Sequence, residues 1–305
     1  MYTVDPLDRG EIFNEMVRRY EPCGGSAAGV NAGMEIQLKT LLGLLLVVST
    51  TAFAQPKLYV FDCGILYLDN VAIFNLKEDE TSVRELFVPC YLVGHDKGLL
   101  FWDGGLPLAV AQAEGRVALE GGTMAYERSV IDQLADMDIK PSDVGYAAFS
   151  HLHFDHVGVA NAFSGSNVLM QKTEWDAAFG GDSGFVDTTL FDELKNSELT
   201  ILEGDHDVFG DGSVRIIYTP GHTPGHQALL VNLKNTGPVI LSGDLYHFRA
   251  NRSLRRAPTF NFDAAMTLDS MDRIEALITE TGATLWIEHD KALADTLRKA
   301  PEFYD

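Results

Sequence analysis

The stretch 150–156, Ser-His-Leu-His-Phe-Asp-His, has the clearest capacity for chemistry in this 305-residue chain, because it holds three histidines and a carboxylate within six residues. His151 and His153 are two positions apart whereas Asp155 and His156 are adjacent, so the four side chains share no single face of a helix or a strand. The spacing therefore predicts a loop. Imidazole and carboxylate suit zinc and its first-row neighbours, and four such ligands exceed the need of a single open catalytic metal. The stretch predicts a site for two metals.

Each of the other candidate ligands also follows a predicted strand. A short apolar strand at 144–149 precedes the histidine-rich stretch. Strands predicted at 214–218, 238–241 and 285–287 are followed by His222, Asp244 and His289. Ligands that all lie at strand ends predict a site along one edge of the fold.

The elements that must position these residues are strands joined mostly by hairpins, with helices at two main points. Strands are predicted at 57–68, 84–93, 99–102, 144–149, 167–171, 214–218, 227–233, 238–241 and 285–287. Helices are predicted at 126–139, around Trp175 with a capping box of Thr173 and Asp176, at 264–279 with Asp263 as N-cap, and in a short segment near the C-terminus. This pattern predicts an α+β fold of two sheets packed face to face with helices outside.

The first 54 residues have the features of a targeting segment. Lys39 precedes the apolar run 41–48, and Ala52-Phe53-Ala54 provides a small-x-small end, so 34–54 is predicted to be a signal peptide cleaved after Ala54. A retained anchor is the alternative, although the run is short for spanning a bilayer. Residues 1–33 are interpreted as a non-structural upstream extension, and 55–305 as the folded domain. The protein is thus predicted to be exported, periplasmic or secreted, without a stable membrane anchor after cleavage.

Charge and cysteine content limit the partners and the redox chemistry. The chain has 44 acidic and 23 basic residues and a formal net charge of −21, which repels nucleic-acid phosphates and anionic membrane surfaces. We therefore expect no nucleic-acid partner. Cys63 and Cys90 are the cysteines after the signal. Export permits a disulfide, but two cysteines do not make a disulfide-dependent scaffold, so free thiols buried in strands are expected.

Four motifs together resemble the metallo-β-lactamase superfamily: the stretch 150–156, Thr-Pro-Gly-His at 219–222, Ser-Gly-Asp at 242–244 and a histidine near the C-terminus, His289. Within that superfamily the chain looks most like the N-acyl homoserine lactonases. The likeness to that group adds Leu-Tyr-Val-Phe at 58–61, Val-Pro-Cys-Tyr-Leu at 88–92, Gly-His-Thr-Pro-Gly-His-Gln at 221–227 and Glu-His-Asp at 288–290. The resemblance covers 57 to the end of the chain. It implies an αβ/βα four-layer sandwich with the metal site at one edge of two packed mixed sheets.

The resemblance also implies a ligand set for two divalent ions, most readily Zn²⁺. His151, His153 and His222 would hold one ion, Asp155, His156 and His289 the second, and Asp244 would bridge the two. The number of ligands agrees with this assignment, because five histidines and two carboxylates give each ion three or four protein ligands and leave room for a shared hydroxide.

The implied reaction is opening of the lactone ring of an N-acyl homoserine lactone, a quorum-quenching activity, by attack of a metal-bridging hydroxide. Asp155 and Asp244 are predicted to act in catalysis as well as in binding, with Asp244 able to transfer a proton. The lactonases have a tyrosine three residues after the bridging aspartate, where this chain has His247. Tyr246 lies one position earlier, so either side chain could stabilise the developing charge.

Several other side chains have two interpretations. His226 either orients the His222 loop or satisfies backbone groups, and Asp103 either binds a ligand imidazole or stabilises a turn. His95 and His206 are predicted to be solvated. The aromatic residues that either line an acyl groove or belong to the core are Phe163, Trp175, Phe179, Phe185, Phe260 and Phe262.

Two other functions remain open. An exported organophosphate triesterase or another ester hydrolase of the same fold would use the same ligands. A metal-binding or sensory protein without turnover is a third reading. Neither the acyl-chain preference nor the oligomeric state follows from the sequence.

Overall fold

The computed structural model describes residues 55–180 and 186–305. The predicted upstream extension, the predicted signal peptide and Phe185 lie outside these residues. None of the helices in the described ranges is long and apolar enough to cross a membrane.

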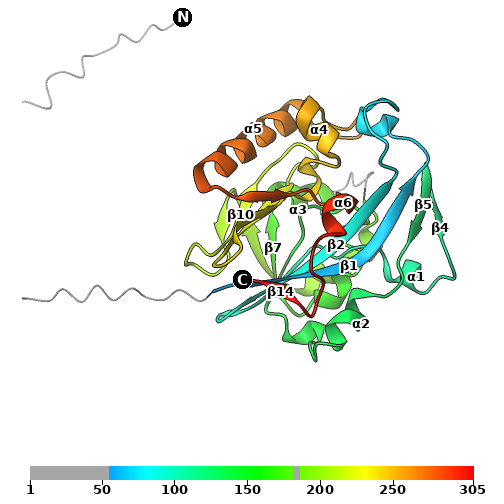
Figure 1. The fold of residues 1–305 in the computed structure, drawn as a ribbon. Helices are drawn as coiled ribbons and strands as arrows, with labels where there is room; N and C mark the ends of the chain where they lie inside the picture. Colours follow the sequence, from blue (N-terminus) through cyan, green and yellow to red (C-terminus); the bar gives the residue numbers. More distant parts are fainter. Residues whose placement is uncertain (1–54, 181–185) are drawn as a thin grey trace, which may run out of the picture. The chain divides into compact units, whose positions relative to one another are not determined.

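Two mixed sheets form the centre of the fold (Figure 1). The larger has the order β4-β5-β1-β2-β3-β6-β7-β8, with β14 paired to β1. Its strands are β1 (Lys57–Leu68), β2 (Glu85–His95), β3 (Gly98–Trp102), β4 (Val117–Leu119), β5 (Gly122–Ala125), β6 (Tyr146–Ala148), β7 (Asn167–Gln171), β8 (Glu198–Leu202) and β14 (Phe303–Tyr304). The strands β3, β6, β7 and β8 run parallel and the other pairs antiparallel.

The smaller sheet has the order β13-β12-β11-β10-β9. Its strands are β9 (His206–Asp207), β10 (Val214–Tyr218), β11 (Gln227–Leu233), β12 (Gly237–Leu241) and β13 (Thr284–Trp286). β13 runs parallel to β12, while the other pairs are antiparallel hairpins. The helices are α1 (Leu108–Ala111), α2 (Val130–Ala135), α3 (Lys172–Phe179), α4 (Arg249–Leu254), α5 (Ala264–Thr281) and α6 (Lys291–Ala294).

Alternation of side chains along the strands produces three apolar layers between four structural layers. Val60 of β1 and Ile216 of β10 belong to the layer between the two sheets. The other face of the larger sheet packs on α2 through Leu134, and the other face of the smaller sheet packs on α5 through Met271 and Ile274. Figure 1 shows α5 beside the sheet of β10 and α2 on the opposite side of the two sheets. The predicted four-layer α+β sandwich is confirmed.

Two predicted helix starts differ from the structure. The helix predicted at 126–139 is only Val130–Ala135, because Ser129 caps it and Asp138 adopts a left-handed conformation with φ of 57°. The capping box at Thr173 is wrong, since α3 already begins at Lys172, directly after β7. The Thr173 hydroxyl instead donates to the Pro224 carbonyl at 2.9 Å. The predicted N-cap of α5 is confirmed.

The prediction of free cysteines is wrong, because Cys63 and Cys90 form a disulfide between β1 and β2. The ladder pairs Phe61 with Cys90, and an irregularity between Asp62 and Ile65 shifts the register beside it. This irregularity brings the Cα of Cys63 to 5.8 Å from that of Cys90. Pairing thus depends on a local break in strand register, which a count of cysteines does not reveal.

The prediction of a solvated His95 is also wrong. The side chain is fully buried, with Nε2 3.0 Å from Asp211 Oδ2 and the ring stacked on Phe209 at 4.1 Å between centroids. The segment between β9 and β10 covers the turn that carries His95. His206 is half-buried in β9 rather than exposed in a turn.

Candidate metal centre

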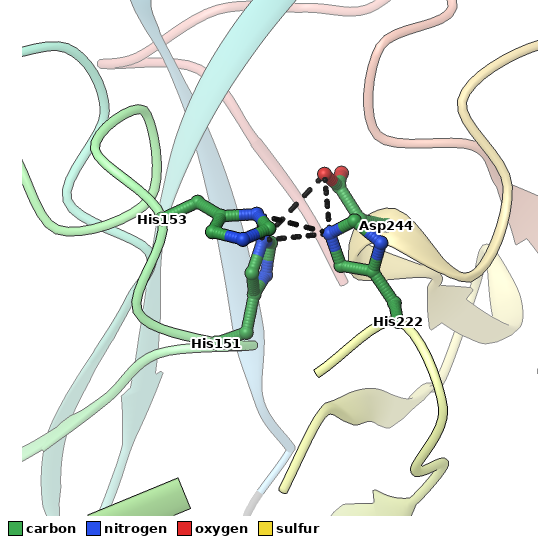
Figure 2. A group of neighbouring side chains, drawn as sticks. All are labelled: His151, His153, His222 and Asp244. Carbon is green, nitrogen blue, oxygen red and sulfur yellow. Dashed lines mark hydrogen bonds and ion pairs between the residues drawn. The ribbon is translucent and has the colours of Figure 1, made fainter. Parts of the chain in front are cut away.

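All seven predicted ligands lie together, on loops that follow strands of both sheets. The segment after β6 carries four of them, and the segments after β10, β12 and β13 carry one each. They form two groups of neighbours: His151, His153, His222 and Asp244, and Asp155, His156 and His289. Figure 2 shows the first group, in which two imidazoles from one loop, a third imidazole and a carboxylate from two other segments point toward one another.

The nitrogen atoms of the first group have the spacing of ligands around one ion. His151 Nε2 lies 2.8 Å from His153 Nδ1 and 3.2 Å from His222 Nε2, and the last two atoms are 3.0 Å apart. Asp244 Oδ2 is 3.3 Å from His222 Nε2. A tetrahedral zinc ion with bonds of about 2.0–2.1 Å would hold its nitrogen ligands about 3.3 Å apart. The donor set fits such an ion.

The second group meets the other oxygen of the same carboxylate. Asp244 Oδ1 is 2.9 Å from His289 Nε2 and 3.3 Å from His156 Nε2, while Asp155 Oδ2 is 3.7 Å from His289 Nε2. His156 Nε2 and Asp244 Oδ1 are buried and make no hydrogen bond within the described part of the chain. Buried polar atoms require partners, so convergent atoms of this kind indicate a place for a cation. Asp244 has the geometry of a bridging ligand.

Hydrogen bonds at the far ring nitrogens leave the near nitrogens free to bind metal. His222 Nδ1 is 3.1 Å from Asn261 Oδ1, and His289 Nδ1 is 2.8 Å from the Phe87 carbonyl oxygen. Because both partners only accept, each Nδ1 carries the proton and each Nε2 presents a lone pair.

Asp103 lies beside a candidate ligand imidazole, as one of its two interpretations had it, and it binds the backbone of another segment rather than its own turn. Its Oδ2 lies 3.3 Å from His156 Nδ1, and its Oδ1 accepts from the Ser150 N–H at 2.6 Å. The carboxylate thus orients one imidazole and holds the start of the histidine-rich loop. The next residue, Gly104, donates its N–H to the His156 carbonyl at 2.5 Å, and a Cβ at Gly104 would lie 3.1 Å from that oxygen. A glycine permits this close approach.

The structure decides between Tyr246 and His247. His247 Nε2 lies 3.0 Å from Asp244 Oδ2. Tyr246 is buried in the layer between the smaller sheet and α5, where its hydroxyl donates to Glu275 Oε1 at 3.0 Å. The prediction of a site role for Tyr246 is therefore corrected. The η6 turn (Gly243–Leu245) sends these two consecutive side chains in opposite directions.

Electrostatics distinguish the two groups. Burial, followed by the neighbouring imidazoles, lowers the pKa of His151 and His153 well below the usual value. Burial also disfavours charge on His156 and His289, but nearby carboxylates, with Asp244 first, outweigh it and raise both pKa values. Burial opposes ionisation of Asp244, yet the surrounding imidazoles hold its pKa well below the usual value. Protons therefore compete with metal more strongly at the second group.

His226 satisfies backbone groups of two ligand-bearing segments. Its Nε2 accepts from the Asp244 N–H at 2.9 Å, and its Nδ1 lies 3.0 Å from the Thr219 carbonyl oxygen, to which it donates. This bonding requires a neutral ring. Burial, aided by the neighbouring His222, lowers the pKa of His226 to about 3.

The pKa of His226 predicts loss of stability in acid. A histidine with a folded pKa of about 3 and an unfolded pKa of about 6.5 binds its proton only on unfolding, so stability falls as pH drops below the unfolded value. Between pH 7 and pH 5 this residue alone should cost about 2 kcal/mol. Denaturant unfolding of the metal-free protein at both pH values measures the loss. His226→Gln, which keeps a donor and an acceptor, should remove this part of the pH dependence; an unchanged dependence would contradict the assignment.

Glu174 of α3 is a site residue that sequence reasoning missed. Its Oε1 accepts from the Leu152 N–H at 3.0 Å and its Oε2 from the Gly225 N–H at 2.8 Å. The buried carboxylate therefore ties the loop of His151 and His153 to the loop of His222. A Cβ at Gly225 would lie 2.4 Å from that of Glu174, so the approach needs a glycine. No sequence signal marks Glu174, because its partners are 22 and 51 residues away.

Glu174→Gln should weaken metal binding at the first group. An amide presents one acceptor oxygen and one NH₂, so one of the two N–H donors loses its partner. We expect metal affinity to fall at least about tenfold and stability by about 2 kcal/mol. Chelator competition and denaturant unfolding measure these quantities. Asp176→Asn, on the exposed face of the same helix, is the matched control. Unchanged metal affinity in Glu174→Gln protein would leave the residue with a structural role alone.

The comparisons with known proteins agree with this geometry. Residues 83–281 match the metallo-beta-lactamase superfamily. The chain is 30% identical to the N-acyl homoserine lactonase AttM of Rhizobium radiobacter over 262 residues, which cover 81% of this chain and 98% of that protein. It is also 30% identical to an N-acyl homoserine lactonase of a Bacillus species over 253 residues, with the same coverage of both chains.

A solved structure extends the likeness to three dimensions. An N-acyl homoserine lactone hydrolase with the product N-hexanoyl-L-homoserine bound at its catalytic metal centre superposes with a TM-score of 0.70 at 28% identity. The match covers 82% of this chain and 99% of that chain. With its four-layer fold and its two groups of ligands joined by Asp244, the chain belongs to the metallo-beta-lactamase superfamily and, within it, to the N-acyl homoserine lactonase family.

Proposed function

We propose that this protein is a metal-dependent hydrolase that opens the lactone ring of N-acyl homoserine lactones. The observation that carries the proposal is the Asp244 carboxylate, which directs one oxygen to each group of ligands and thus makes a dinuclear centre. The relatives named as N-acyl homoserine lactonases align with about four fifths of this chain, and they support the substrate class.

Zinc is the ion that we propose for both positions, because imidazoles with a few carboxylates suit it well. The residues that would hold the ions are those of the two groups defined above. When bound, two such ions would lower the pKa of a water molecule at the centre and polarise an ester carbonyl.

The side chains around the centre supply the remaining chemistry. Asp244, ionised and buried, is placed to take up a proton and return it to the oxygen that leaves the ring. The His247 Nε2–H lies beside the same carboxylate, where it can stabilise negative charge on a substrate oxygen. In this position it stands in for the tyrosine hydroxyl of the lactonase pattern.

An apolar cavity beside the second group suits the acyl chain of the substrate. It has a volume of about 300 Å³ and reaches Asp155, Asp244 and His289; we call it the acyl cavity. Its apolar lining includes Leu66, Leu68, Ile73, Phe74, Leu86 and Phe154. Predominantly apolar walls with a few polar groups at one end are typical of a site for a small amphipathic ligand.

Hydrolysis of N-hexanoyl homoserine lactone by the zinc-loaded protein, followed as acid release with metal content measured on the same sample, tests the proposal. We expect ring opening with about two ions per chain. An aryl phosphotriester is the comparison substrate. If two ions are bound and only the phosphotriester is hydrolysed, the dinuclear centre stands and the lactonase assignment gives way to a triesterase.

We also propose that the protein is exported. The leader-like stretch at 34–54 supports this, and so does the buried Cys63–Cys90 disulfide, because such bonds persist mainly in oxidising compartments. N-terminal sequencing of the protein from its native source should find Gln55 as the first residue; a protein that retains residues 34–54 would contradict cleavage.

A further inference from the structure

The metal centre lies between two cavities. The acyl cavity borders Asp155 and His289 of the second group, and another cavity of about 330 Å³ borders His222 of the first group. Within the described residues, the linings of these two cavities have only His153 and Phe260 in common. His153 is a candidate metal ligand. Phe260 is therefore the residue between the two cavities that can be replaced without removal of a ligand.

The ring of Phe260 stands edge-on among the aromatic side chains of the centre. Its centroid is 5.6 Å from that of Phe74 in the acyl cavity, 5.7 Å from His222 and 5.6 Å from His247. The interplanar angles are 81°, 79° and 86°. Edge-to-face contacts of this kind are favourable and hold the ring in one orientation.

Backbone bonds on both sides hold Phe260 in place. The Thr259 N–H donates to the Ile73 carbonyl at 2.8 Å, next to the acyl cavity. The Phe262 N–H donates to the His222 carbonyl at 3.0 Å. The Phe260 side chain is 37% exposed, so its truncation removes a wall between cavities rather than a piece of the core.

We infer that Phe260 is a specificity-determining residue that closes the acyl cavity and sets the longest acyl chain that binds well. This inference rests on the proposed function. Each methylene that enters the acyl cavity should raise kcat/KM about fourfold, until the cavity is full. Phe260 stands beside the metal centre, where the lactone ring must lie, so removal of its ring joins the two cavities there. An acyl chain that is too long for the acyl cavity can then enter the second cavity. The favoured substrates then shift to long-chain N-acyl homoserine lactones.

The test compares kcat/KM for butanoyl, hexanoyl, octanoyl, decanoyl and dodecanoyl homoserine lactones with the zinc-loaded full chain. Phe260→Ala should raise the ratio of dodecanoyl to butanoyl kcat/KM at least about tenfold over the unaltered protein, since a few further methylenes become buried. Phe262→Ala is the matched control, because Phe262 is 63% exposed and lines the second cavity but not the acyl cavity. Its ratio should match that of the unaltered protein. Phe260→Leu should give an intermediate ratio. This variant replaces Phe260→Ala in the test if the alanine variant fails to fold.

A binding measurement separates this inference from the proposed function. Calorimetry of butanoate through dodecanoate with the same metal-loaded proteins gives Kd without turnover. If no lactone is opened but Phe260→Ala selectively tightens binding of the longer acids, the lactonase assignment fails and the role of Phe260 stands. Chain-length profiles that run parallel in the unaltered, Phe260→Ala and Phe262→Ala proteins, in both measurements, would overturn the inference and leave the proposed function intact.

Discussion

Replacement of Asp244 by alanine should lower kcat/KM for lactone hydrolysis at least about a thousandfold and reduce the bound metal below two ions per chain. Among the described residues, Asp244 is the one side chain whose two oxygens face different ligand groups: Oδ2 lies 3.3 Å from His222 Nε2, and Oδ1 lies 2.9 Å from His289 Nε2. Its loss removes a ligand from both ions and the base beside His247. Steady-state kinetics and metal analysis of the same sample measure both effects.

Asp272→Ala provides the control for the Asp244 variant, because Asp272 is an exposed carboxylate of α5 that pairs with Arg255. It should retain two ions and full activity. Asp244→Ala protein that still bound two ions and opened the lactone at the original rate would show that Asp244 does not bridge. Loss of activity with both ions retained would restrict Asp244 to proton transfer.

Removal of the metals should destabilise the protein as well as inactivate it. Seven polar side chains are packed around the centre, and only His153 and Phe154 of the stretch 151–156 are more than slightly exposed. At free zinc a thousandfold above Kd, binding contributes about 4 kcal/mol to stability, which corresponds to about 10 °C in Tm for a domain of this size. Calorimetric unfolding of loaded, chelated and reloaded protein measures the change. Equal Tm values for the loaded and chelated forms would contradict a resident metal centre.

Acidification should remove the two ions in a definite order. The pKa of His156 and His289 is raised, so protons displace metal from the second group first as pH falls. The pKa of His151 and His153 is lowered, so these ligands stay neutral to lower pH and retain their ion longer. Metal content after equilibration along a pH series should therefore pass through one ion per chain. Simultaneous loss of both ions would contradict this difference between the groups.

The sequence by itself predicted the candidate ligands and two packed sheets with helices outside, and its resemblance to the metallo-β-lactamase superfamily supplied the division of the ligands between two ions and the four-layer order. The ligand types are concentrated in the stretch 151–156, and the other three ligands each follow a strand whose apolar pattern is plain. Strand ends are local features, and ends of packed strands meet at one edge, so local patterns were sufficient to predict a shared site. The same reasoning applies to α5, whose N-cap Asp263 was predicted from its immediate neighbours.

Only the tertiary structure decided which groups meet across the chain. The sequence does not show whether Tyr246 or His247 faces the metal centre. The η6 turn directs Tyr246 to Glu275 and His247 to Asp244. The register irregularity of β1 brings Cys63 to Cys90, and the roles of Glu174 and Phe260 depend on segments far along the chain. Such contacts depend on distances between segments that local propensity does not encode, because packing of the whole fold sets those distances.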